Sequence, residues 1–473
     1  MLTRRAFLRN TIRSSAGLAF TSSTRDILHA AGVPISPRLT GEAPVHVPGN
    51  FIGLGYEMSS VATPGLLSAA NHSYAALVDG LGPAGVIRAG GIVADYTRYE
   101  PDGKASWDRK NTVITRAELE QFAGFLEKTG WQAIWSVNFA QGNLAEGAAE
   151  AQAVQKILGS RLLALELGNE VENYLRGEKP FRKPPYDYET YRTEYREWHA
   201  AIAKAVPTVP FAAPDTASSV EWVEHMAKDA KGDVQLLTTH YYRENQKRGS
   251  VELLLHPDPR LKDVLVRLRE ASRKSGIPWR MCETNSFSGG GLSGVSDSFV
   301  GTLWTLDFML LLAAYGCAGV NIETGVNQLG FISSYSPIVD DGSSAARPGA
   351  SYYGMLAFAA AAKDCTEILP MDFDAQGINL TAYALGGNGK PRAVVAVNRD
   401  RAQDAHLSLW ALGLREGDAL RLSAPSAEST SGITFGGAAV DAEGHWKAAR
   451  RETLRDGLLT VPRMSAAVVR SGD

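Results

Sequence analysis

Hydrophobic residues between positions 51 and 322 gather into eight short runs rich in strand-forming residues. The runs are Phe51–Gly55, Gly85–Ala89, Ala133–Asn138, Leu162–Leu167, Val209–Ala213, Val234–Thr239, Pro278–Cys282 and Gly316–Ile322. Helical patterns of about 10 to 20 residues separate them, and this alternation is typical of parallel βαβ units whose sheet is covered on both faces. Eight evenly spaced units predict a closed (β/α)8 barrel, an α/β fold, rather than an open doubly wound sheet.

Apolar positions at helical spacing predict the helices between these strands. Thr115 and Glu118 form a capping box that opens an amphipathic helix, and Gly130 is placed to end it. We also expect helices over residues 186–205 and 298–315. The second of these is apolar on most faces, so it should pack tightly against the barrel.

After residue 362 the pattern changes to short alternating runs separated by Gly, Asp and Pro turns. The expected strands are Leu380–Ala384, Ala393–Asn398, His406–Trp410, Ala419–Leu422 and Ala466–Val469. Such a pattern predicts an antiparallel β-sandwich. We therefore place the barrel at residues 48–362 and the β-sandwich at 363–473, with a further strand expected from residues 33–47.

The first 32 residues are predicted to form an export signal. They begin Met1-Leu-Thr-Arg-Arg-Ala-Phe-Leu8 and continue with a short apolar stretch and small residues at 30–32. This pattern resembles a bacterial twin-arginine export signal, so we expect a periplasmic or secreted protein whose signal is removed. The alternative is a basic disordered tail. No run reaches the roughly 18 to 20 apolar residues of a membrane-spanning helix, so no span is expected.

Composition narrows the classes of partner. The 473 residues carry 48 Lys and Arg against 51 Asp and Glu, a formal net charge of −3 without long blocks of like charge. This balance argues against a nucleic-acid partner. Three cysteines cannot make a disulfide scaffold, and we expect Cys282 and Cys317 to be buried thiols. The sequence does not indicate an oligomeric state.

Two glutamates occupy the positions where barrel enzymes carry their reactive groups. Glu170 follows the fourth run and Glu283 the seventh, and catalytic residues of such barrels lie at the carboxyl ends of strands. Two carboxylates that face each other suit glycoside hydrolysis: retaining at a separation of about 5 to 5.5 Å, inverting at about 6.5 to 9.5 Å. The alternative, solvated loop carboxylates, is disfavoured by the apolar strands before them. Glu166 is a weaker candidate one layer deeper.

Further motifs resemble one family of glycoside hydrolases. The Asn169-Glu170 pair and the glutamate of the seventh strand look like clan A of these enzymes. Finer features are similar to family 79, the heparanase and β-glucuronidase family, and together they cover about residues 45 to 360. They are the segment Arg88–Tyr96, Ala213-Pro-Asp215, His240-Tyr-Tyr242, the loop Glu283–Gly291 and Ser296-Asp-Ser-Phe299.

The resemblance implies roles for individual residues. Glu170 would be the general acid/base and Glu283 the nucleophile of a retaining double displacement. Asn169 would bind the sugar 2-hydroxyl, and Tyr242 would hold the nucleophile ionised and aimed. The remaining candidates would bind the substrate: the backbone N–H groups of Gly289 and Gly290 and the Tyr335 hydroxyl at the uronic carboxylate, and Asp95, Glu57 and Asn138 at other hydroxyls.

The resulting hypothesis is an exo-acting β-glucuronidase that acts on a glucuronide or a glycan containing uronic acid. Ser288 stands where the family often has Tyr, so neutral-sugar enzymes of clan A, an α-L-arabinofuranosidase or a β-xylosidase, remain as alternatives. A non-catalytic carbohydrate-binding protein is a third hypothesis. Because both carboxylates must differ in protonation, we expect an acidic to neutral pH optimum.

No cofactor or metal is expected from the sequence. It contains no His-Glu-x-x-His motif and no Cys/His cluster of metal-binding spacing. Residues 289–294 match G-x-G-x-x-G, but they come late in the chain and six residues separate them from the preceding strand, so dinucleotide binding is disfavoured. We expect His240 to hold other site residues in place, with a catalytic role as the alternative. We expect the basic run 243–248 to be a solvated loop, with contact to an anionic glycan as the alternative.

Overall fold

Eight parallel strands close into a barrel in the computed structural model, which describes residues 33–177, 180–229, 232–326, 331–342 and 345–472. Around the ring the order is β3-β4-β7-β8-β9-β10-β11-β12, and β12 pairs with β3. The bounds are β3 (Ile52–Glu57), β4 (Val86–Gly90), β7 (Gln132–Val137), β8 (Leu162–Leu167), β9 (Phe211–Thr216), β10 (Leu236–Asn245), β11 (Trp279–Ser288) and β12 (Val320–Glu323). All eight predicted runs form barrel strands, which confirms the predicted fold. The predicted export signal lies outside the described residues.

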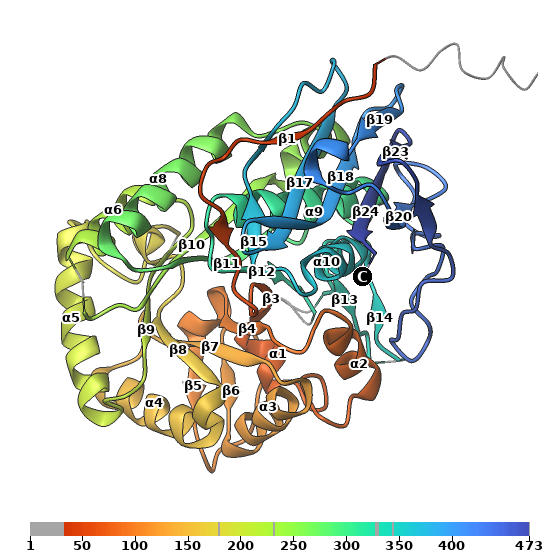
Figure 1. Cartoon of the computed structure of the whole chain (residues 1–473). Coiled ribbons are helices and arrows are strands. Elements are labelled where there is room, and N and C mark those ends of the chain that lie inside the picture. Colours follow the sequence, from red (N-terminus) through yellow and green to blue (C-terminus); the bar gives the residue numbers. More distant parts are fainter. Residues whose placement is uncertain (1–32, 178–179, 230–231, 327–330, 343–344, 473) are drawn as a thin grey trace, which may run out of the picture. The chain divides into compact units, whose positions relative to one another are not determined.

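Helices surround these strands (Figure 1). Their bounds are α1 (Met58–Ala62), α2 (His72–Gly80), α3 (Arg116–Thr129), α4 (Leu144–Leu158), α5 (Tyr188–Ala205), α6 (Val220–Asp229), α7 (Val251–Leu255), α8 (Pro259–Ser275), α9 (Phe299–Ala314) and α10 (Ala350–Ala362). The three predicted helices correspond to α3, α5 and α9. The capping box of α3 is present at Thr115 and Glu118, and Gly130 ends the helix in the left-handed conformation with φ of 77°.

Strands β10 and β11 extend farther than the hydrophobic pattern predicted. They end at Asn245 and Ser288 instead of Thr239 and Cys282, and they stay paired in parallel to their last residues. The apolar pattern stops where the barrel core gives way to a polar cavity, whereas backbone pairing continues. Glu283 therefore lies within a strand, which fixes its backbone on both sides.

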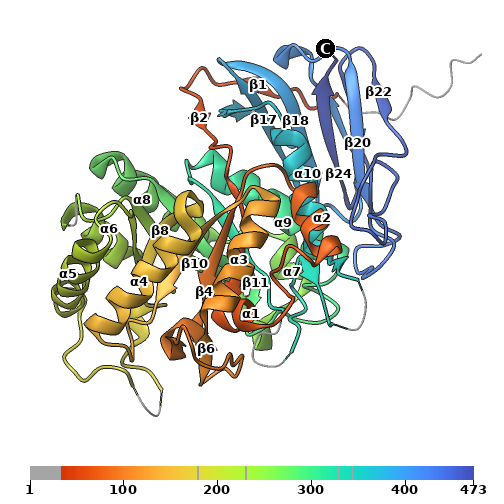
Figure 2. The ribbon, with the colours of Figure 1, turned by 90° about the horizontal axis from the view of Figure 1, so that it is seen from below.

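The C-terminal part contains an eight-stranded sheet, in which the long strands lie side by side (Figure 2). Its order is β2 (Val45–His46), β15 (Glu367–Leu369), β17 (Leu380–Gly387), β18 (Lys390–Asn398), β24 (Ser465–Ser471), β20 (Gly417–Ser423) and β21 (Thr434–Phe435), with β22 (Glu452–Leu454) beside β20. Smaller pairs are β1 (Arg38–Leu39) with β16 (Met371–Asp372), β19 (Ala405–Ser408) with β23 (Leu458–Val461), β5 (Thr97–Tyr99) with β6 (Thr112–Ile114), and β13 (Ile338–Val339) with β14 (Arg347–Pro348).

Both faces of the large sheet are buried, as a sandwich requires. Val395 and Val468 are paired across β18 and β24 and belong to the core that continues into the barrel. The next pair, Val394 and Val469, points the other way into a second core that includes Leu407 of β19. Successive residues of β18 are thus buried on opposite faces of the sheet. The strand therefore has a continuous apolar run instead of alternating apolar and polar residues, as expected for a strand covered on both sides.

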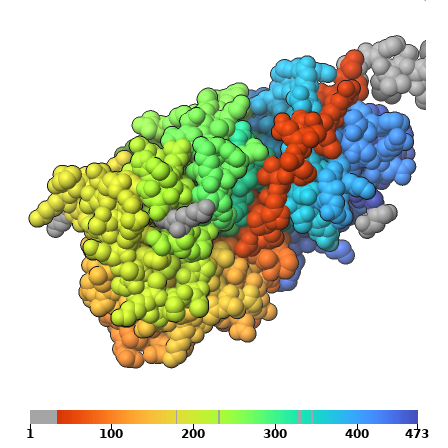
Figure 3. All heavy atoms as spheres, turned by 60° about the vertical axis from the view of Figure 1, so that its left-hand side comes forward, coloured from red at the N-terminus to blue at the C-terminus, as the bar shows by residue number. Residues whose placement is uncertain are grey.

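Residues before the barrel join the C-terminal sheets. Strand β2 pairs with β15 and β1 pairs with β16, both antiparallel. Figure 3 shows this segment in red along the surface, between the green surface of the barrel and the blue surface of the C-terminal part. The first described residues thus contribute strands to sheets otherwise built from the end of the chain.

A buried polar cluster links helix α9 to the large sheet. The Asp307 carboxylate accepts hydrogen bonds from Thr381 Oγ1 at 2.5 Å and the Tyr383 hydroxyl at 3.0 Å, and it pairs with Arg399 at 3.0 Å. Asp307 is an isolated charge on an otherwise apolar helix, so these three partners offset its removal from water. The cluster ties the barrel to the sheet.

Within the described residues, no helix is both long and apolar enough to cross a membrane.

Candidate active site

A polar cavity of about 640 Å³ opens at the carboxyl ends of the barrel strands. Barrel enzymes place their reactive groups at this end. Seven of the ten predicted site residues line this cavity: Glu57, Asn169, Glu170, Tyr242, Glu283, Gly289 and Tyr335. His240 and Ser288 line it as well.

Glu170 is held by the turn that follows β8. Its backbone adopts the left-handed conformation with φ of 47°, which is uncommon for a residue with a side chain. One carboxylate oxygen lies 3.4 Å from His240 Nδ1, and the other accepts a hydrogen bond from Asn173 Nδ2 at 3.2 Å. Burial raises the pKa of Glu170, but His240 and Asn173 more than offset this effect, so the pKa lies below its usual value.

Glu283 has a different environment. Arg88 donates to Glu283 Oε2 at 2.9 Å, and the Tyr242 hydroxyl donates to Oε1 at 2.9 Å. Each carboxylate oxygen therefore has one donor, and these two bonds fix the orientation of the carboxylate. An oxygen of Glu283, an oxygen of Glu170 and a ring nitrogen of His240 all lie within 4.8 Å of one another.

The buried Arg88 guanidinium, from β4, organises the residues beneath the cavity. Besides Glu283 it donates to Glu166 at 3.0 Å, Asn169 at 3.0 Å and Asp215 at 2.5 Å. We call these five residues the Arg88 cluster. They come from strands β4, β8, β9 and β11 and the turn after β8, so one side chain aligns both halves of the barrel. Arg88 was noted in a motif but not predicted as a site residue. The signal was a lone arginine inside an apolar strand.

Glu166 lies one layer deeper than Glu170, as expected from strand alternation. It is fully buried and accepts hydrogen bonds from Arg88 Nε and Ser136 Oγ, the latter at 2.8 Å. Burial and the neighbouring Asp215 raise the pKa of Glu166 to about 7, although Arg88 opposes this shift. Glu166 does not line the cavity, so its role is to hold Arg88 in position beneath the cavity.

His240 connects the Arg88 cluster to Glu170. Its Nε2 lies 2.7 Å from Asp215, and its Nδ1 faces Glu170 at 3.4 Å and Glu283 at 3.8 Å. Burial lowers the pKa of His240, but the surrounding carboxylates raise it well above its usual value. The imidazole is thus held as a cation between Asp215 and the two candidate catalytic glutamates. Its position is closer to the reacting groups than the sequence predicted.

Two further carboxyl groups lie near Glu283. Glu57, at the end of β3, accepts a hydrogen bond from Val93 N at 2.8 Å and lines the cavity. Glu323, at the end of β12, is 1% exposed, and neither of its carboxylate oxygens has a hydrogen-bond partner among the described residues. Burial and repulsion from Glu283 and Glu57 raise the pKa of Glu323 well above its usual value, so it is held neutral.

Two predicted substrate-binding residues lie behind the cavity. Asp95 is 1% exposed and accepts a hydrogen bond from the Tyr174 hydroxyl at 2.8 Å. Asn138 donates to the Thr97 carbonyl at 2.8 Å and accepts from the Gln141 backbone N–H at 3.0 Å. Neither lines the active-site cavity, and Asn138 lines a different one. Both side chains are already engaged in holding loops at the barrel mouth.

The glycine loop after β11 forms one wall of the cavity. Gly289, Gly290 and Gly291 have φ values of 86°, 99° and 81°, a conformation that favours glycine. Gly289 lines the cavity, whereas Gly290 lies against Phe331, whose ring would be 2.7 Å from an added Cβ. Tyr335 is buried beside Tyr242, with ring centroids 6.3 Å apart.

The other sequence features have ordinary structural roles. Cys282 and Cys317 are free, buried thiols, as predicted. In the basic run, Arg248 pairs with Glu244 at 2.5 Å and Arg243 pairs with Asp258 at 3.3 Å. Both arginines also line the cavity, so the run forms part of its wall rather than a separate loop.

No protein-family model matches the chain. Among curated proteins it is similar to a β-glucuronidase of Aspergillus niger, with 23% identity over 341 residues, 63% of this chain and 62% of the relative. It is also similar to a β-glucuronidase of Neurospora crassa, with 25% identity over 322 residues, 58% of this chain and 55% of the relative. The chain thus spans less than two thirds of the length of either relative.

Solved structures share the fold. A 4-O-α-L-rhamnosyl-β-D-glucuronidase from Fusarium oxysporum superposes with a TM-score of 0.75 at 18% identity, covering 92% of this chain and 99% of the other. A family 51 α-L-arabinofuranosidase from Bifidobacterium longum gives a TM-score of 0.66 at 15% identity, covering 93% and 100%. The chain is thus similar in part of its sequence to two β-glucuronidases of family 79 type, and it shares its fold with a rhamnosyl-glucuronidase and with an arabinofuranosidase.

Proposed function

We propose that the chain is a retaining β-glucuronidase that releases terminal glucuronic acid from a glycan or glycoside. The observation that carries this proposal is the pair Glu170 and Glu283 in one cavity, with one carboxylate oxygen of Glu170 within 4.8 Å of one carboxylate oxygen of Glu283, a closeness that favours the shorter of two separations. An inverting enzyme needs about 6.5 to 9.5 Å to place a water between its carboxyl groups, whereas about 5 to 5.5 Å suits direct attack by one of them.

The surroundings of the two glutamates support different roles. Glu283 is held in one orientation by Arg88 and Tyr242, which suits a nucleophile aimed at the sugar. Glu170 has no arginine partner among the described residues, its side chain is 31% exposed, and it faces the polarised imidazole of His240. This position suits a group that gives up and takes back a proton during the reaction.

The reaction follows from these roles in two steps. Glu283 attacks the anomeric carbon, the bond to the leaving oxygen breaks, and the Glu170 proton passes to that oxygen. A water then attacks the anomeric carbon, Glu170 takes its proton, and the bond to Glu283 breaks. Arg88 fixes the acceptor end of the Asn169 amide by donating to Oδ1, so a sugar hydroxyl would meet the NH2 end.

The preference for glucuronate rests on one part of the cavity wall. Gly289, Tyr335 and Ser288 line this part of the cavity, and each can offer a neutral donor to the uronic carboxylate. The names of the two curated relatives and of the Fusarium oxysporum neighbour point to the same sugar. We propose exo action on a terminal residue, for which the release of monosaccharide from an oligosaccharide is the diagnostic product.

A substrate panel tests the proposal. We expect hydrolysis of 4-nitrophenyl β-D-glucuronide but not of the matching glucoside, xyloside or arabinofuranoside. Glu283→Gln should lower the rate at least about a thousandfold because the nucleophile is lost. Glu189→Gln, on the exposed face of α5, serves as the matched control and should retain full activity. Full activity in Glu283→Gln would refute the assignment of the nucleophile.

A neutral-sugar glycosidase is the second candidate. Ser288 in place of the family's tyrosine removes one contact near the carboxylate, and the Bifidobacterium longum arabinofuranosidase shares the fold. If the arabinofuranoside or xyloside were cleaved and the glucuronide were not, the roles of Glu170 and Glu283 would stand. The carboxylate-binding roles of Gly289 and Tyr335 would then be wrong.

We also propose export by a twin-arginine route, supported by Arg4-Arg5 and the residues that follow them. The test expresses the full chain in a bacterium and fractionates the cells. Activity should appear outside the cytoplasm, and Arg4→Lys with Arg5→Lys should retain it inside. Equal distribution of both forms would contradict export by this route.

A further inference from the structure

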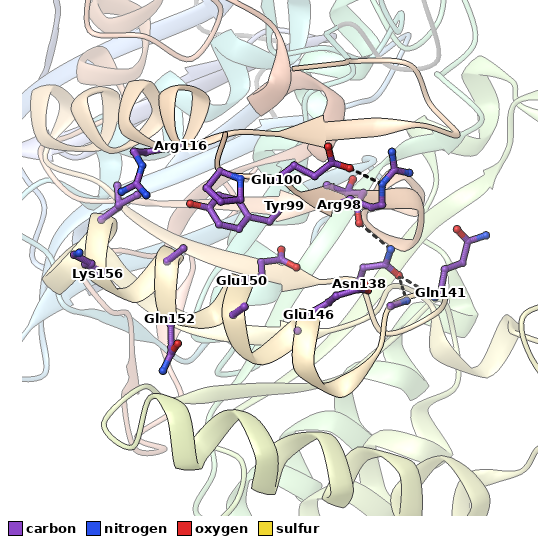
Figure 4. Close-up of a pocket in the computed structure, with 17 residues that line it drawn as sticks. Arg98, Tyr99, Glu100, Arg116, Asn138, Gln141, Glu146, Glu150, Gln152 and Lys156 are labelled. Carbon is purple, nitrogen blue, oxygen red and sulfur yellow. Dashed lines mark hydrogen bonds and ion pairs between the residues drawn. The ribbon is translucent and has the colours of Figure 1, made fainter. Parts of the chain in front are cut away.

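A second cavity, of about 540 Å³, lies between helix α4 and strand β5 on the flank of the barrel (Figure 4). Its volume falls within the range of about 300 to 1,000 Å³ that is usual for small-molecule sites. It shares no lining residue with the active-site cavity. Ala149 and Ala153 line the α4 side, and their small side chains leave the space open.

A buried carboxyl group faces this second cavity. Glu150, from α4, is 6% exposed, and its Oε1 accepts a hydrogen bond from Trp135 Nε1 at 2.8 Å. In Figure 4 its side chain lies in the middle of the cavity, between Tyr99 and Asn138. Burial raises the pKa of Glu150 to about 7, so near neutral pH it both accepts and donates hydrogen bonds.

Cationic side chains lie at one end of the cavity. Arg116 and Lys156 are exposed, and neither forms an ion pair with any residue that the structure describes. Figure 4 shows both on the side toward which the Tyr99 hydroxyl points. The opposite end carries Arg98, which is already paired with Glu100 at 3.0 Å. The available positive charge is therefore concentrated near Tyr99.

The walls are held in place by hydrogen bonds through Asn138. Its amide donates to the Thr97 carbonyl at the start of β5, and its oxygen accepts from the backbone of Gln141 before α4. This one side chain joins the two walls of the cavity. The space is thus braced independently of any ligand, which lowers the entropic cost of binding.

These features restrict the chemistry of the ligand. A simple anion would be repelled by Glu150 and Glu146, and a simple cation by Arg116 and Lys156. Hydroxyl groups, by contrast, pair with a carboxyl group in either protonation state, and a sugar ring can pack on Tyr99. We propose that this cavity is a second glycan-binding site, which takes an oligosaccharide bearing a carboxylate, with the carboxylate at Arg116 and Lys156 and its hydroxyls at Glu150.

The proposal is tested by binding rather than by turnover. Isothermal titration of the Glu283→Gln chain with a hyaluronan tetrasaccharide, which carries two carboxylates, should show two sites per chain. Tetra-N-acetylchitotetraose, of equal length but uncharged, should bind the second site at least about tenfold more weakly. Adding Arg116→Ala and Lys156→Ala should weaken that site about tenfold or more, and Ala153→Trp should fill it.

Matched controls separate this site from charge effects and from catalysis. Lys128→Ala and Lys204→Ala remove two exposed cations outside both cavities and should leave binding unchanged. In the chain with Glu283 intact, the Arg116 and Lys156 changes should leave 4-nitrophenyl β-D-glucuronide hydrolysis unaltered. Equal affinity at every observed site after the Arg116 and Lys156 changes would overturn the proposal, whatever the number of sites, whereas one site that these changes weaken would support the second cavity and count against binding at the active site. Because binding is measured without turnover, failure of the proposed enzymatic function would be seen separately.

Discussion

His240→Gln should move the basic limb of the activity profile to higher pH. In the proposed mechanism, activity requires protonated Glu170, so kcat/KM should fall as pH rises through the pKa of Glu170 in the free enzyme. Burial raises that pKa, and the hydrogen bond and positive charge of His240 lower it below its usual value. Removing the imidazolium leaves burial as the main influence. The pKa of Glu170 then rises, and protonated enzyme persists to higher pH.

The size of the shift follows from the geometry. Two unit charges 3.4 Å apart, the distance from His240 Nδ1 to Glu170 Oε1, interact by about 1.2 kcal/mol at a dielectric constant of about 80 and about 5 kcal/mol at about 20. At about 1.36 kcal/mol per pKa unit this spans about 0.9 to 3.6 units. Because the Glu170 side chain is 31% exposed, screening favours the lower part, about one to two units.

The assay is the pH dependence of kcat/KM for 4-nitrophenyl β-D-glucuronide, read after alkaline quenching. The maximal rate should also fall, since His240 supports Asp215, but the position of the basic limb is independent of that loss. His256→Gln, at an exposed histidine 62% accessible to solvent, is the control and should leave the profile unchanged. An unchanged limb in His240→Gln, or one moved to lower pH, would refute this electrostatic account.

Three further perturbations follow from the structure. Tyr242→Phe removes a hydrogen bond to the Glu283 carboxylate, worth about 1.5 to 3 kcal/mol, so kcat/KM should fall about 10- to 100-fold; an undiminished value would exclude Tyr242 from holding the nucleophile. Asp307→Ala leaves Arg399 buried without its partner and should lower the free energy of unfolding in urea by about 3 to 5 kcal/mol; a change below about 1 kcal/mol would contradict the buried cluster. Glu323→Gln replaces a neutral carboxyl group with a neutral amide, so the free energy of unfolding at pH 7, measured by thermal denaturation, should stay within about 1 kcal/mol of the unchanged protein. A larger change would indicate an ionised Glu323.

The hydrophobic pattern was sufficient for the barrel but not for the lengths of its strands. Each of the eight runs became a strand because burial on both faces demands continuous apolar residues. The same rule fails at the barrel mouth, where β10 and β11 continue through Tyr242 and Glu283 with polar side chains. Pairing between backbones carries no hydrophobic signal, so the sequence placed the ends of these strands six residues too early.

The candidate site was predictable where a single residue stands at the end of an apolar run and less so where side chains from different strands meet. Glu170 and Glu283 were found from their positions alone. Arg88, by contrast, acts by binding partners on β8, β9 and β11. Because tertiary packing decides which buried charges pair across a barrel, the sequence pattern did not predict these bonds. Asn138 shows the opposite error: its place after a strand suggested substrate binding, whereas its amide is already used by backbone groups.

In the proposed mechanism, charge balance around the active site allows a glutamate with a lowered pKa to act as an acid. Burial raises the pKa of Glu323 well above its usual value and that of Glu166 to about 7, so Glu323 stays neutral and Glu166 is partly protonated near neutral pH. The cations Arg88 and His240 then face mainly Asp215, Glu283 and Glu170, and the first two are bound directly. A glucuronate bound beside this cluster would add one more negative charge and exclude water from Glu170. Both effects favour protonation of Glu170, so the carboxylate of the proposed substrate would itself bring the general acid into its active form.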